Sequence, residues 1–260
     1  MPTGAFTEQL DLPLLLVIAF FLFFLALVYY LRGEDKREGY PLVSDRTRGT
    51  GKRMSVVGFP NLPKPKSFLM QDGTLRYAPH ADKERDLNMA PAYPFPGAPF
   101  QPLGDPLLDG VGPASYALKE DKPLRSIEGH LTVAPMRNNP DYYLEESGPA
   151  LIGIPVVAAD GAPIGTVKDL WVNAVEYFIR YVEIDVNVEG GKTGTLLAPF
   201  YFAELHNGRM KFGTLTREQL LRVPTLATSE YITAREEDRL NAYFAGGTLY
   251  AKNGAQGPFL

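Results

Sequence analysis

A continuous apolar stretch near the start of the chain, Leu12 to Leu31, constrains the fold more than any other feature. Its twenty residues include no charged side chain. A helix of this length measures about 30 Å, which matches the hydrocarbon core of a lipid bilayer. Asp11 suits the N-cap of such a helix, and Pro13 suits its first turn. We therefore predict a single transmembrane helix over residues 12–31.

The charged residues that flank this stretch predict its orientation. No Lys or Arg precedes it, and the charged side chains on that side are Glu8 and Asp11. The positive-inside rule places the side that is rich in Lys and Arg in the cytoplasm. We expect residues 1–11 to be periplasmic and the rest of the chain, after the helix, to be cytoplasmic. The basic residues on the cytoplasmic side are Arg32, Lys36, Arg37, Arg46, Arg48, Lys52 and Arg53.

The composition argues against several classes of function. The chain contains no cysteine, which excludes disulfides, thiolate metal sites, Fe–S clusters and covalent c-type haem attachment. Its three histidines, His80, His130 and His206, do not have the spacing of metal ligands. A formal net charge of -4 gives no electrostatic reason to expect a nucleic-acid partner. No phosphate-binding or nucleophile motif is present, so we expect no catalytic centre.

Proline dominates the middle of the chain. Thirteen of the 23 prolines fall between Pro41 and Pro123, a density that excludes long helices and central strands. Segments 61–66 and 91–102 are typical of extended or polyproline-like chain. Because aromatic residues are interspersed here, we expect residues 32–150 to lie extended on partner subunits. A disordered linker and a proline-rich ligand segment are the alternatives.

Short alternating strands characterise residues 151–250. Two apolar runs around the turn at 160–163 predict a β-hairpin. In the next strand, over 178–188, Val182, Ile184 and Val186 alternate with Glu183 and other polar residues, as expected for a strand with one buried face. Further strands at regular spacing predict a small antiparallel barrel that is closed or nearly closed.

Two helices are predicted near the end of the chain. Residues 216–222 have the pattern of a short helix or turn before Pro224. Thr233 and Glu236 form a capping-box pattern at the start of a longer helix, and Gly246-Gly247 predict its end. Residues 251–260 are then a flexible tail.

Several motifs in this order resemble one family, the H subunits of purple-bacterial photosynthetic reaction centres. The resemblance extends over nearly the whole chain, and the motifs are specific as a set although each is modest alone. The resemblance implies a single N-terminal transmembrane helix and a mainly-β cytoplasmic domain, which is a PRC-type antiparallel β-barrel with a C-terminal helix. The motifs are Arg37–Leu42 (REGYPL), Leu62–Lys66 (LPKPK), Gly104–Ser115 (GDPLLDGVGPAS), Val167–Val172 (VKDLWV) and the EED…AGG…YA pattern over Glu236–Ala251.

The resemblance also implies a function. Such a subunit binds no pigment, caps the cytoplasmic face of the L and M subunits, stabilises the complex and contributes the proton path to the secondary quinone. The partner subunits hold bacteriochlorophyll, bacteriopheophytin, quinones, non-haem iron and a carotenoid, and antenna polypeptides and a cytochrome subunit belong to the same assembly. The implied location is the bacterial inner membrane, in its intracytoplasmic or chromatophore form, in contact with membrane lipids.

Seven proton-transfer residues follow from matching this sequence to the family. Glu176 matches an acidic residue in the turn that faces the secondary quinone, whereas Asn173 stands where better-known members carry Asp. An amide binds water but does not carry a proton as a carboxylate does. Arg180 matches a basic residue that holds an acidic cluster. The remaining candidates are Glu236 and Glu237 as partners of Arg180, and Glu128 and His130 as the surface entry point, where Ser126 replaces a further acid.

Each of these residues also has a plainer interpretation. Glu176 suits a solvated turn, Arg180 a cross-strand pair and His130 an ordinary surface position. Tyr30, Arg32, Lys36 and Arg37 are candidates for contact with lipid headgroups, or are simply topological anchors. For the whole chain, the alternative function is a membrane-tethered PRC-barrel adaptor that recruits a cytoplasmic partner.

Overall fold

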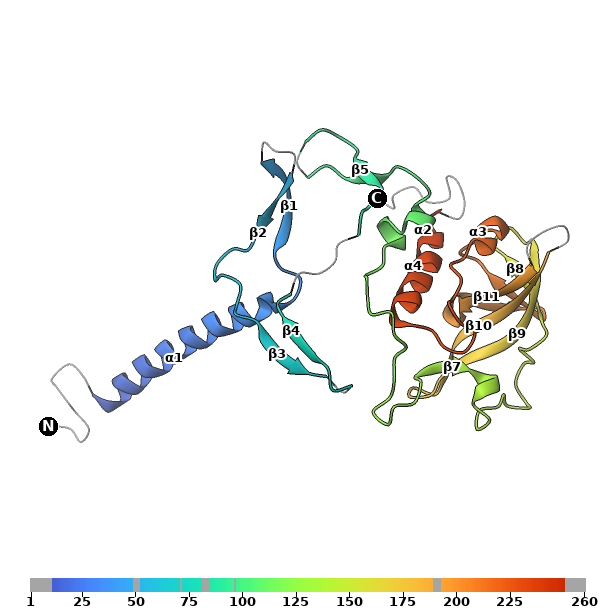
Figure 1. Ribbon diagram of the computed structural model, residues 1–260, viewed down its shortest axis with the longest axis horizontal. Coiled ribbons are helices and arrows are strands. Elements are labelled where there is room, and N and C mark those ends of the chain that lie inside the picture. The colour runs from blue at the N-terminus through green and yellow to red at the C-terminus, as the bar shows by residue number, and fades with distance from the viewer. Residues whose placement is uncertain are drawn as a thin grey trace. The chain divides into compact units, whose positions relative to one another are not determined.

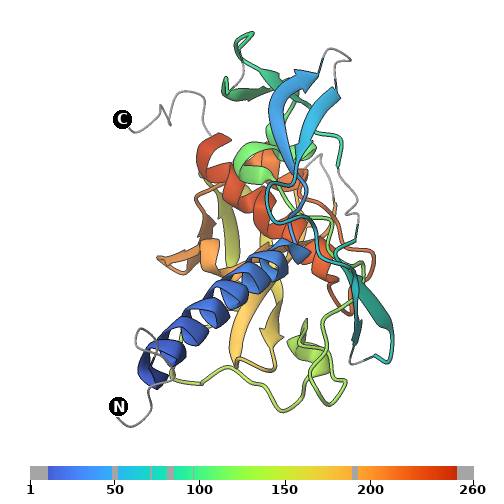
Figure 2. The ribbon, with the colours of Figure 1, turned by 90° about the vertical axis from the view of Figure 1, so that its left-hand side faces the viewer.

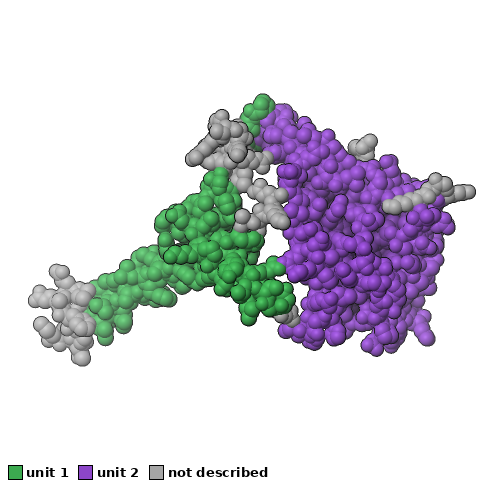
Figure 3. Space-filling model, in the orientation of Figure 1, with its two compact units in different colours: residues 1–83, 94–97 green, residues 84–93, 98–260 purple. Residues whose placement is uncertain are grey.

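The computed structural model describes residues 11–48, 52–70, 72–80, 85–95, 97–188 and 193–250. Most of the predicted periplasmic segment, residues 1–10, and the predicted tail, residues 251–260, lie outside this part of the chain. The chain divides into two compact units, Met1–Lys83 with Pro94–Gly97 and Glu84–Tyr93 with Ala98–Leu260 (Figure 3). Each unit is described by itself.

The first unit begins with the predicted apolar helix. Helix α1 spans Leu12–Glu34 and continues into a 3-10 turn, η1, at Asp35–Arg37 (Figure 1). Asp11 caps it as predicted, since its Oδ1 accepts a hydrogen bond of 2.9 Å from the Leu14 amide. None of its residues is buried, and it is long and apolar enough to cross a membrane. A helix that is apolar on all sides and has no protein around it fits a lipid environment.

The Pro-rich region forms isolated two-stranded hairpins. The density of proline predicts that no long helix and no central strand occurs here, and the described residues confirm this. The longest helix of the region, α2 at Pro106–Asp109, is a single turn that Asp105 caps. The hairpins pair β1 (Leu42–Arg48) with β2 (Lys52–Val56), β3 (Lys66–Leu69) with β4 (Leu75–Ala78), and β5 (Met89–Pro91) with β6 (Phe100–Pro102).

The second unit is built on a seven-stranded sheet. Its hydrogen-bonded order is β11-β10-β9-β8-β13-β12, and β7 pairs with β9. The predicted hairpin around residues 160–163 is confirmed as β8 and β9, and the predicted strand over 178–188 is β10. The strands are β7 (Val133–Pro135), β8 (Pro155–Ala158), β9 (Pro163–Asn173), β10 (Phe178–Asn187), β11 (Thr193–Pro199), β12 (Ala203–His206) and β13 (Arg209–Phe212).

This sheet differs from the predicted antiparallel barrel in one pair of strands. No ladder joins β11 to β12 among the described strands, so the barrel is not fully closed, which the prediction of a closed or nearly closed barrel allows. The pair of β8 and β13 is parallel, whereas an entirely antiparallel barrel is expected from the sequence. Parallel neighbours need a long connection, and here all of β9 to β12 lies between the two strands. The periodicity of a strand does not indicate which distant strand will pair with it.

Helix α4, Ala234–Tyr250, packs against this sheet, as the two views show together (Figures 1 and 2). Phe244 is fully buried, and its ring lies 5.8 Å from that of Phe212 on β13. Trp171 and Tyr181 are the largest side chains of the same core. Burial of aromatic side chains of this size is the main source of stability in a domain of this kind.

The two predicted C-terminal helices form, but one ends later than predicted. Helix α3, Arg217–Leu221, begins with a capping box formed by Thr216 and Gln219. Helix α4 continues through Gly246 and Gly247 to Tyr250, so the prediction that these glycines end it was wrong. A Cβ on Gly246 would lie 2.6 Å from Ala114 Cβ, and one on Gly247 would lie 2.2 Å from the Thr214 carbonyl oxygen. The glycines thus allow close packing of the helix.

Candidate functional site

The turn between β9 and β10 positions Glu176. The side-chain oxygen of Asn173 accepts hydrogen bonds from the backbone amides of Val175 (3.0 Å) and Glu176 (3.1 Å), which fixes the turn. The amide of Asn173 then donates a hydrogen bond of 2.7 Å to Glu176 Oε2. Asn173 is buried and Glu176 is exposed. The first two predicted site residues are therefore in direct contact, with the amide orienting the carboxylate.

A second predicted pair joins β10 to α4. Arg180 forms an ion pair of 3.0 Å with Glu237, and the Tyr181 hydroxyl donates a hydrogen bond of 2.9 Å to the same Glu237 oxygen. Asn241 donates to the Tyr181 hydroxyl at 3.3 Å. Burial raises the pKa of Tyr181 far above its ordinary value, so that the hydroxyl stays protonated and acts as a donor.

Glu236 has a different role from its neighbour Glu237. One of its oxygens accepts from the Thr233 amide at 2.9 Å, and the other accepts from the Ala227 amide at 2.7 Å. This is the capping contact that the sequence predicts at the start of α4. Glu236 therefore fixes the helix start and the segment before it, and Arg180 is paired with Glu237 instead.

Glu128 and His130 lie in a tight loop that closes at Arg125 and Leu131. The Ser126 amide donates to the His130 carbonyl oxygen at 2.8 Å, and Gly129, at φ 88°, forms the turn. The Ser126 side chain lowers the pKa of the Glu128 carboxyl, and the nearby imidazole of His130 contributes in the same direction. Two exposed titratable groups are thus held two residues apart on one loop.

This loop and the β9–β10 turn line one hollow of about 860 Å³. The Ala174 amide donates to the Thr132 carbonyl oxygen at 2.8 Å and so joins the two segments. No group of three or more potential metal ligands occurs among the described residues. The hollow is lined by Arg125, Ser126, Ile127, Glu128, Gly129, His130, Leu131, Ala134, Asn138, Asn139, Asp141, Ala174, Val175 and Tyr177.

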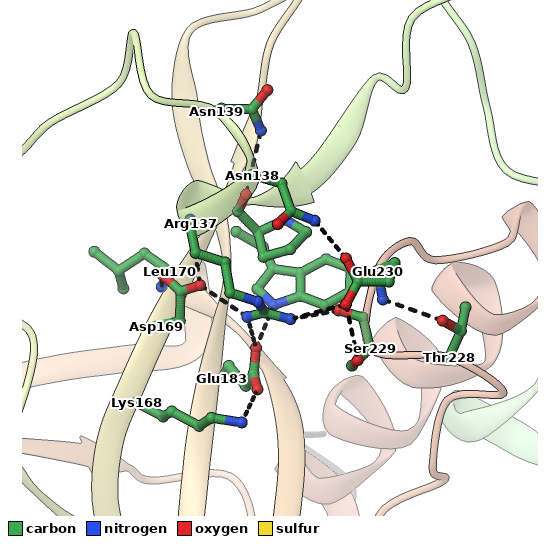
Figure 4. Close-up of polar contacts among 12 residues, drawn as sticks. Arg137, Asn138, Asn139, Lys168, Asp169, Leu170, Glu183, Thr228, Ser229 and Glu230 are labelled. Carbon is green, nitrogen blue, oxygen red and sulfur yellow. Dashed lines mark hydrogen bonds and ion pairs between the residues drawn. The ribbon is translucent and has the colours of Figure 1, made fainter.

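An ionic cluster that was not predicted from the sequence surrounds two buried acids on β9 and β10, Asp169 and Glu183 (Figure 4). Arg137 forms ion pairs with Asp169 (2.8 Å) and Glu183 (2.6 Å), two acids that face each other across the strands. Lys168 bonds the other Glu183 oxygen at 2.8 Å, and the Trp171 indole donates to Glu183 at 3.0 Å. This group of five residues is called the Arg137 cluster below.

The position of Glu183 corrects the strand pattern expected from the sequence. The alternation along β10 predicts that Glu183 faces solvent, yet it is only 3% exposed. The 3-10 turn η3, Met136–Asn138, and the segment at Ser229 cover this part of the sheet, and Arg137 also donates to the Ser229 carbonyl oxygen at 2.5 Å. The covering residues are far from β10 in sequence, which explains why periodicity alone was misleading.

The pKa of Glu183 predicts a loss of stability in acid. Burial alone would raise it, but hydrogen bonds from Lys168, Trp171 and Arg137 outweigh burial and lower the pKa below the ordinary value of 4.5. A group whose pKa is lower in the folded state stabilises the fold above about pH 4.5, and this contribution is lost as the pH falls through the folded-state pKa.

We therefore expect Glu183→Gln to flatten the fall in stability below about pH 4.5. The measurement is urea unfolding of the full chain at a series of pH values, followed by Trp171 emission. The control is Glu204→Gln, because Glu204 is exposed on β12. If Glu183→Gln retained the whole acid dependence, other carboxyls would be responsible for it.

The end of α1 and the turn η1 that follows it contain the four residues predicted to meet headgroups. Tyr30 and Arg32 are exposed. Lys36 is buried, because its ammonium bonds the carbonyl oxygens of Val57, at 2.7 Å, and of Pro60. Arg37 binds Glu34 through two bonds of 2.8 Å and also donates to the carbonyl oxygens of Lys64 and Ala78. Two of these three cations, Lys36 and Arg37, thus hold the following segments against the helix end.

Two known protein families match this chain, one in its N-terminal half and one in the sheet domain. The model of the photosynthetic reaction centre H-chain N-terminal region matches residues 4–138, more than half of the chain. The model of the PRC-barrel domain matches residues 145–213, which contain β8 to β13. The chain belongs to the reaction-centre H-chain family. The H subunit is therefore a membrane-anchored component of the reaction-centre complex, and its family is one of structural subunits.

The H subunit positions its site residues by a mixture of local and distant contacts. Trp171 is buried in the core of this chain. The Arg137 cluster had one signal in the sequence. The turn at 174–177 fixes the register of β9 and β10, which places Asp169 opposite Glu183. Two like charges directly opposite each other need a cation between them.

Proposed function

We propose that this H subunit caps the cytoplasmic face of the pigment-binding L and M subunits, stabilises them and carries protons to the secondary quinone. The observation that supports this most strongly is the hollow shared by the Glu128–His130 loop and the Glu176 turn. Glu128 and His130 line this hollow together with Ala174, Val175 and Tyr177, which belong to the turn that carries the Glu176 carboxylate. A row of such groups, with water between them, is what proton transfer to a buried acceptor requires.

Each group has a definite task in this proposal. Glu128 and His130 take protons from the cytoplasm, because both are exposed and lie together on one loop that lines the hollow. Glu176 passes protons towards the quinone, which takes up two when it is doubly reduced. Asn173 holds Glu176 in place and does not itself carry a proton, since its amide neither gains nor loses a proton at neutral pH. Arg180 and Glu237 fix the charge balance between β10 and α4.

Exposed apolar side chains around the hollow support a partner protein at this place. Ile127, Val175 and Tyr177 line the hollow and are exposed in the isolated chain. Clustered apolar groups on a surface indicate an interface. In the proposal this partner belongs to L or M, which hold the bacteriochlorophyll, bacteriopheophytin, quinones, non-haem iron and carotenoid. This chain binds none of them directly.

The proposed location follows from the same assignment. The chain crosses the bacterial inner membrane, in its intracytoplasmic or chromatophore form, with residues 1–11 in the periplasm and the sheet domain in the cytoplasm. The charges that flank α1 support this orientation. Antenna polypeptides and a cytochrome subunit are further members of the proposed assembly. Among the headgroup candidates, Tyr30 and Arg32 are the accessible ones for lipid.

Replacing Glu176 with Gln in the assembled complex tests the proton path. We expect the flash-induced second electron transfer to the quinone, which is coupled to proton uptake, to slow on the order of tenfold. The first electron transfer should stay nearly normal, because it does not require a proton. The control is Glu204→Gln, an exposed carboxylate of the same domain. An unchanged second transfer in Glu176→Gln would mean that protons enter elsewhere.

A further inference from the structure

The segment between β2 and β3 folds back along the last turns of α1 (Figure 1). Lys36, just beyond the helix, binds the carbonyl oxygens of Val57 and Pro60 and so fixes both sides of Phe59. Among the described residues, the buried ammonium forms no ion pair with an acid. It also makes a cation–π contact with Tyr40, 5.4 Å from the centroid of the ring. The position of Phe59 is therefore determined by the helix end.

Phe59 packs against Tyr29, a residue of the apolar stretch itself. Their ring centroids are 5.7 Å apart, and the planes are tilted by 52°. Phe59 is nevertheless 83% exposed, which is unusual for a ring whose backbone is held so firmly. A large apolar side chain that is held in a fixed position and is mostly exposed needs another environment to cover it.

The depth of Phe59 follows from the geometry of the helix. Tyr29 precedes the helix end, Glu34, by five residues, or about 7 Å at 1.5 Å per residue. It lies two residues inside the end of the charge-free stretch at Leu31. The headgroup layer on each side of a bilayer is about 5–8 Å thick. A ring beside Tyr29 therefore lies where the acyl chains meet the headgroups.

We infer that Phe59 is a second membrane anchor, which inserts beside Tyr29 into the boundary between headgroups and acyl chains. Aromatic rings favour this layer. A positive charge beside the same helix end also fits the headgroup layer. The Lys66 ammonium lies 3.2 Å from the Tyr30 hydroxyl and 5.4 Å from the centroid of the Tyr30 ring. The chain thus contacts the bilayer with a loop in addition to α1. The inference depends on α1 crossing a membrane and is independent of the proton path.

Depth-dependent quenching of an introduced tryptophan tests this anchor. The variant Phe59→Trp is made in the full chain and reconstituted in phosphatidylcholine vesicles with bromine placed high or low on the acyl chain. We expect lipid brominated near the headgroup to quench the emission of the introduced tryptophan at least threefold more strongly than acrylamide, which quenches from the water. Trp171, the one natural tryptophan, is buried and supplies a constant background that also reports correct folding.

The matched control is Tyr143→Trp, because Tyr143 is 84% exposed and lies in the other compact unit. We expect acrylamide, not brominated lipid, to quench the indole at that position. The inference is overturned if acrylamide quenches Phe59→Trp as strongly as Tyr143→Trp. It is equally overturned if neither quencher reaches Phe59→Trp, since the ring would then be covered by protein.

Discussion

Replacing Arg137 with Ala is expected to destabilise the sheet domain of the H subunit by about 3 kcal/mol. The guanidinium bonds Asp169 and Glu183 at once, and both acids are buried. Among the described residues, its removal leaves Asp169 without a cation and Glu183 with Lys168 alone. Breaking a buried ion pair costs about 3–5 kcal/mol, and the 35% exposure of the Arg137 side chain favours the lower end of this range.

Urea unfolding of the full chain, followed by Trp171 emission, measures this effect directly, because the indole donates to Glu183 within the same cluster. The control is Arg209→Ala, which removes an exposed arginine from β13 of the same sheet. We expect that change to lie within about 0.5 kcal/mol of the wild type. If Arg137→Ala were as mild, Lys168 alone would be sufficient to balance both acids.

A double variant separates charge from packing. Adding Glu183→Gln to Arg137→Ala removes one of the buried negative charges that the first change leaves behind. We expect the double variant to recover part of the lost stability, because an unpaired buried charge costs more than an absent pair. A purely additive loss would instead show that the arginine stabilises the domain through its packing and its bond to the Ser229 carbonyl oxygen.

The parts of this fold that the sequence predicts are those that depend on neighbouring residues. Helix α1 follows from its uninterrupted apolar run, and its cap at Asp11 follows from local residue preference. The hairpin around residues 160–163 follows from turn residues between two apolar runs. Contacts of this kind are determined within about a dozen residues, so one sequence is sufficient to predict them.

Distant contacts explain what the sequence did not reveal. Arg137 precedes Glu183 by 46 residues, and its other partner Ser229 follows it by 92. The parallel pair of β8 and β13 and the open side of the barrel likewise depend on which distant strands meet. Periodicity indicates that a strand has two faces, and it gives no information about which distant segment covers the polar one.

The contacts of the candidate site likewise divide into those formed within one turn and those formed by segments that are distant in the sequence. Asn173 and Glu176 are three residues apart in one turn, so their contact could be expected from turn chemistry. For Arg180 two acids were possible partners from the sequence, and only the packing of α4 on β10 distinguishes Glu237 from Glu236. Lys36 was expected near lipid headgroups. It is buried because the following loop returns to the helix end, a contact that the composition of the helix does not indicate.

Replacing Gly247 with Ala is expected to destabilise the domain by about 2 kcal/mol, although Ala favours a helix over Gly by about 1 kcal/mol. The new Cβ would lie 2.2 Å from the Thr214 carbonyl oxygen and 2.5 Å from a methyl carbon of Leu215. Because the first of these atoms belongs to the backbone, α4 itself must move away from residues 214 and 215. Overpacking of this kind outweighs the gain in helix propensity.

The same urea experiment measures the effect, and Gly213→Ala is the control, because nothing lies within 4 Å of the position of its Cβ. Gly213→Ala should change stability little, whereas Gly247→Ala should lower the unfolding midpoint clearly. A gain in stability for Gly247→Ala would show that α4 can shift at no cost. The contact between α4 and residues 214–215 would then not be what requires glycine, and the interpretation of Gly246-Gly247 as a packing surface would fail.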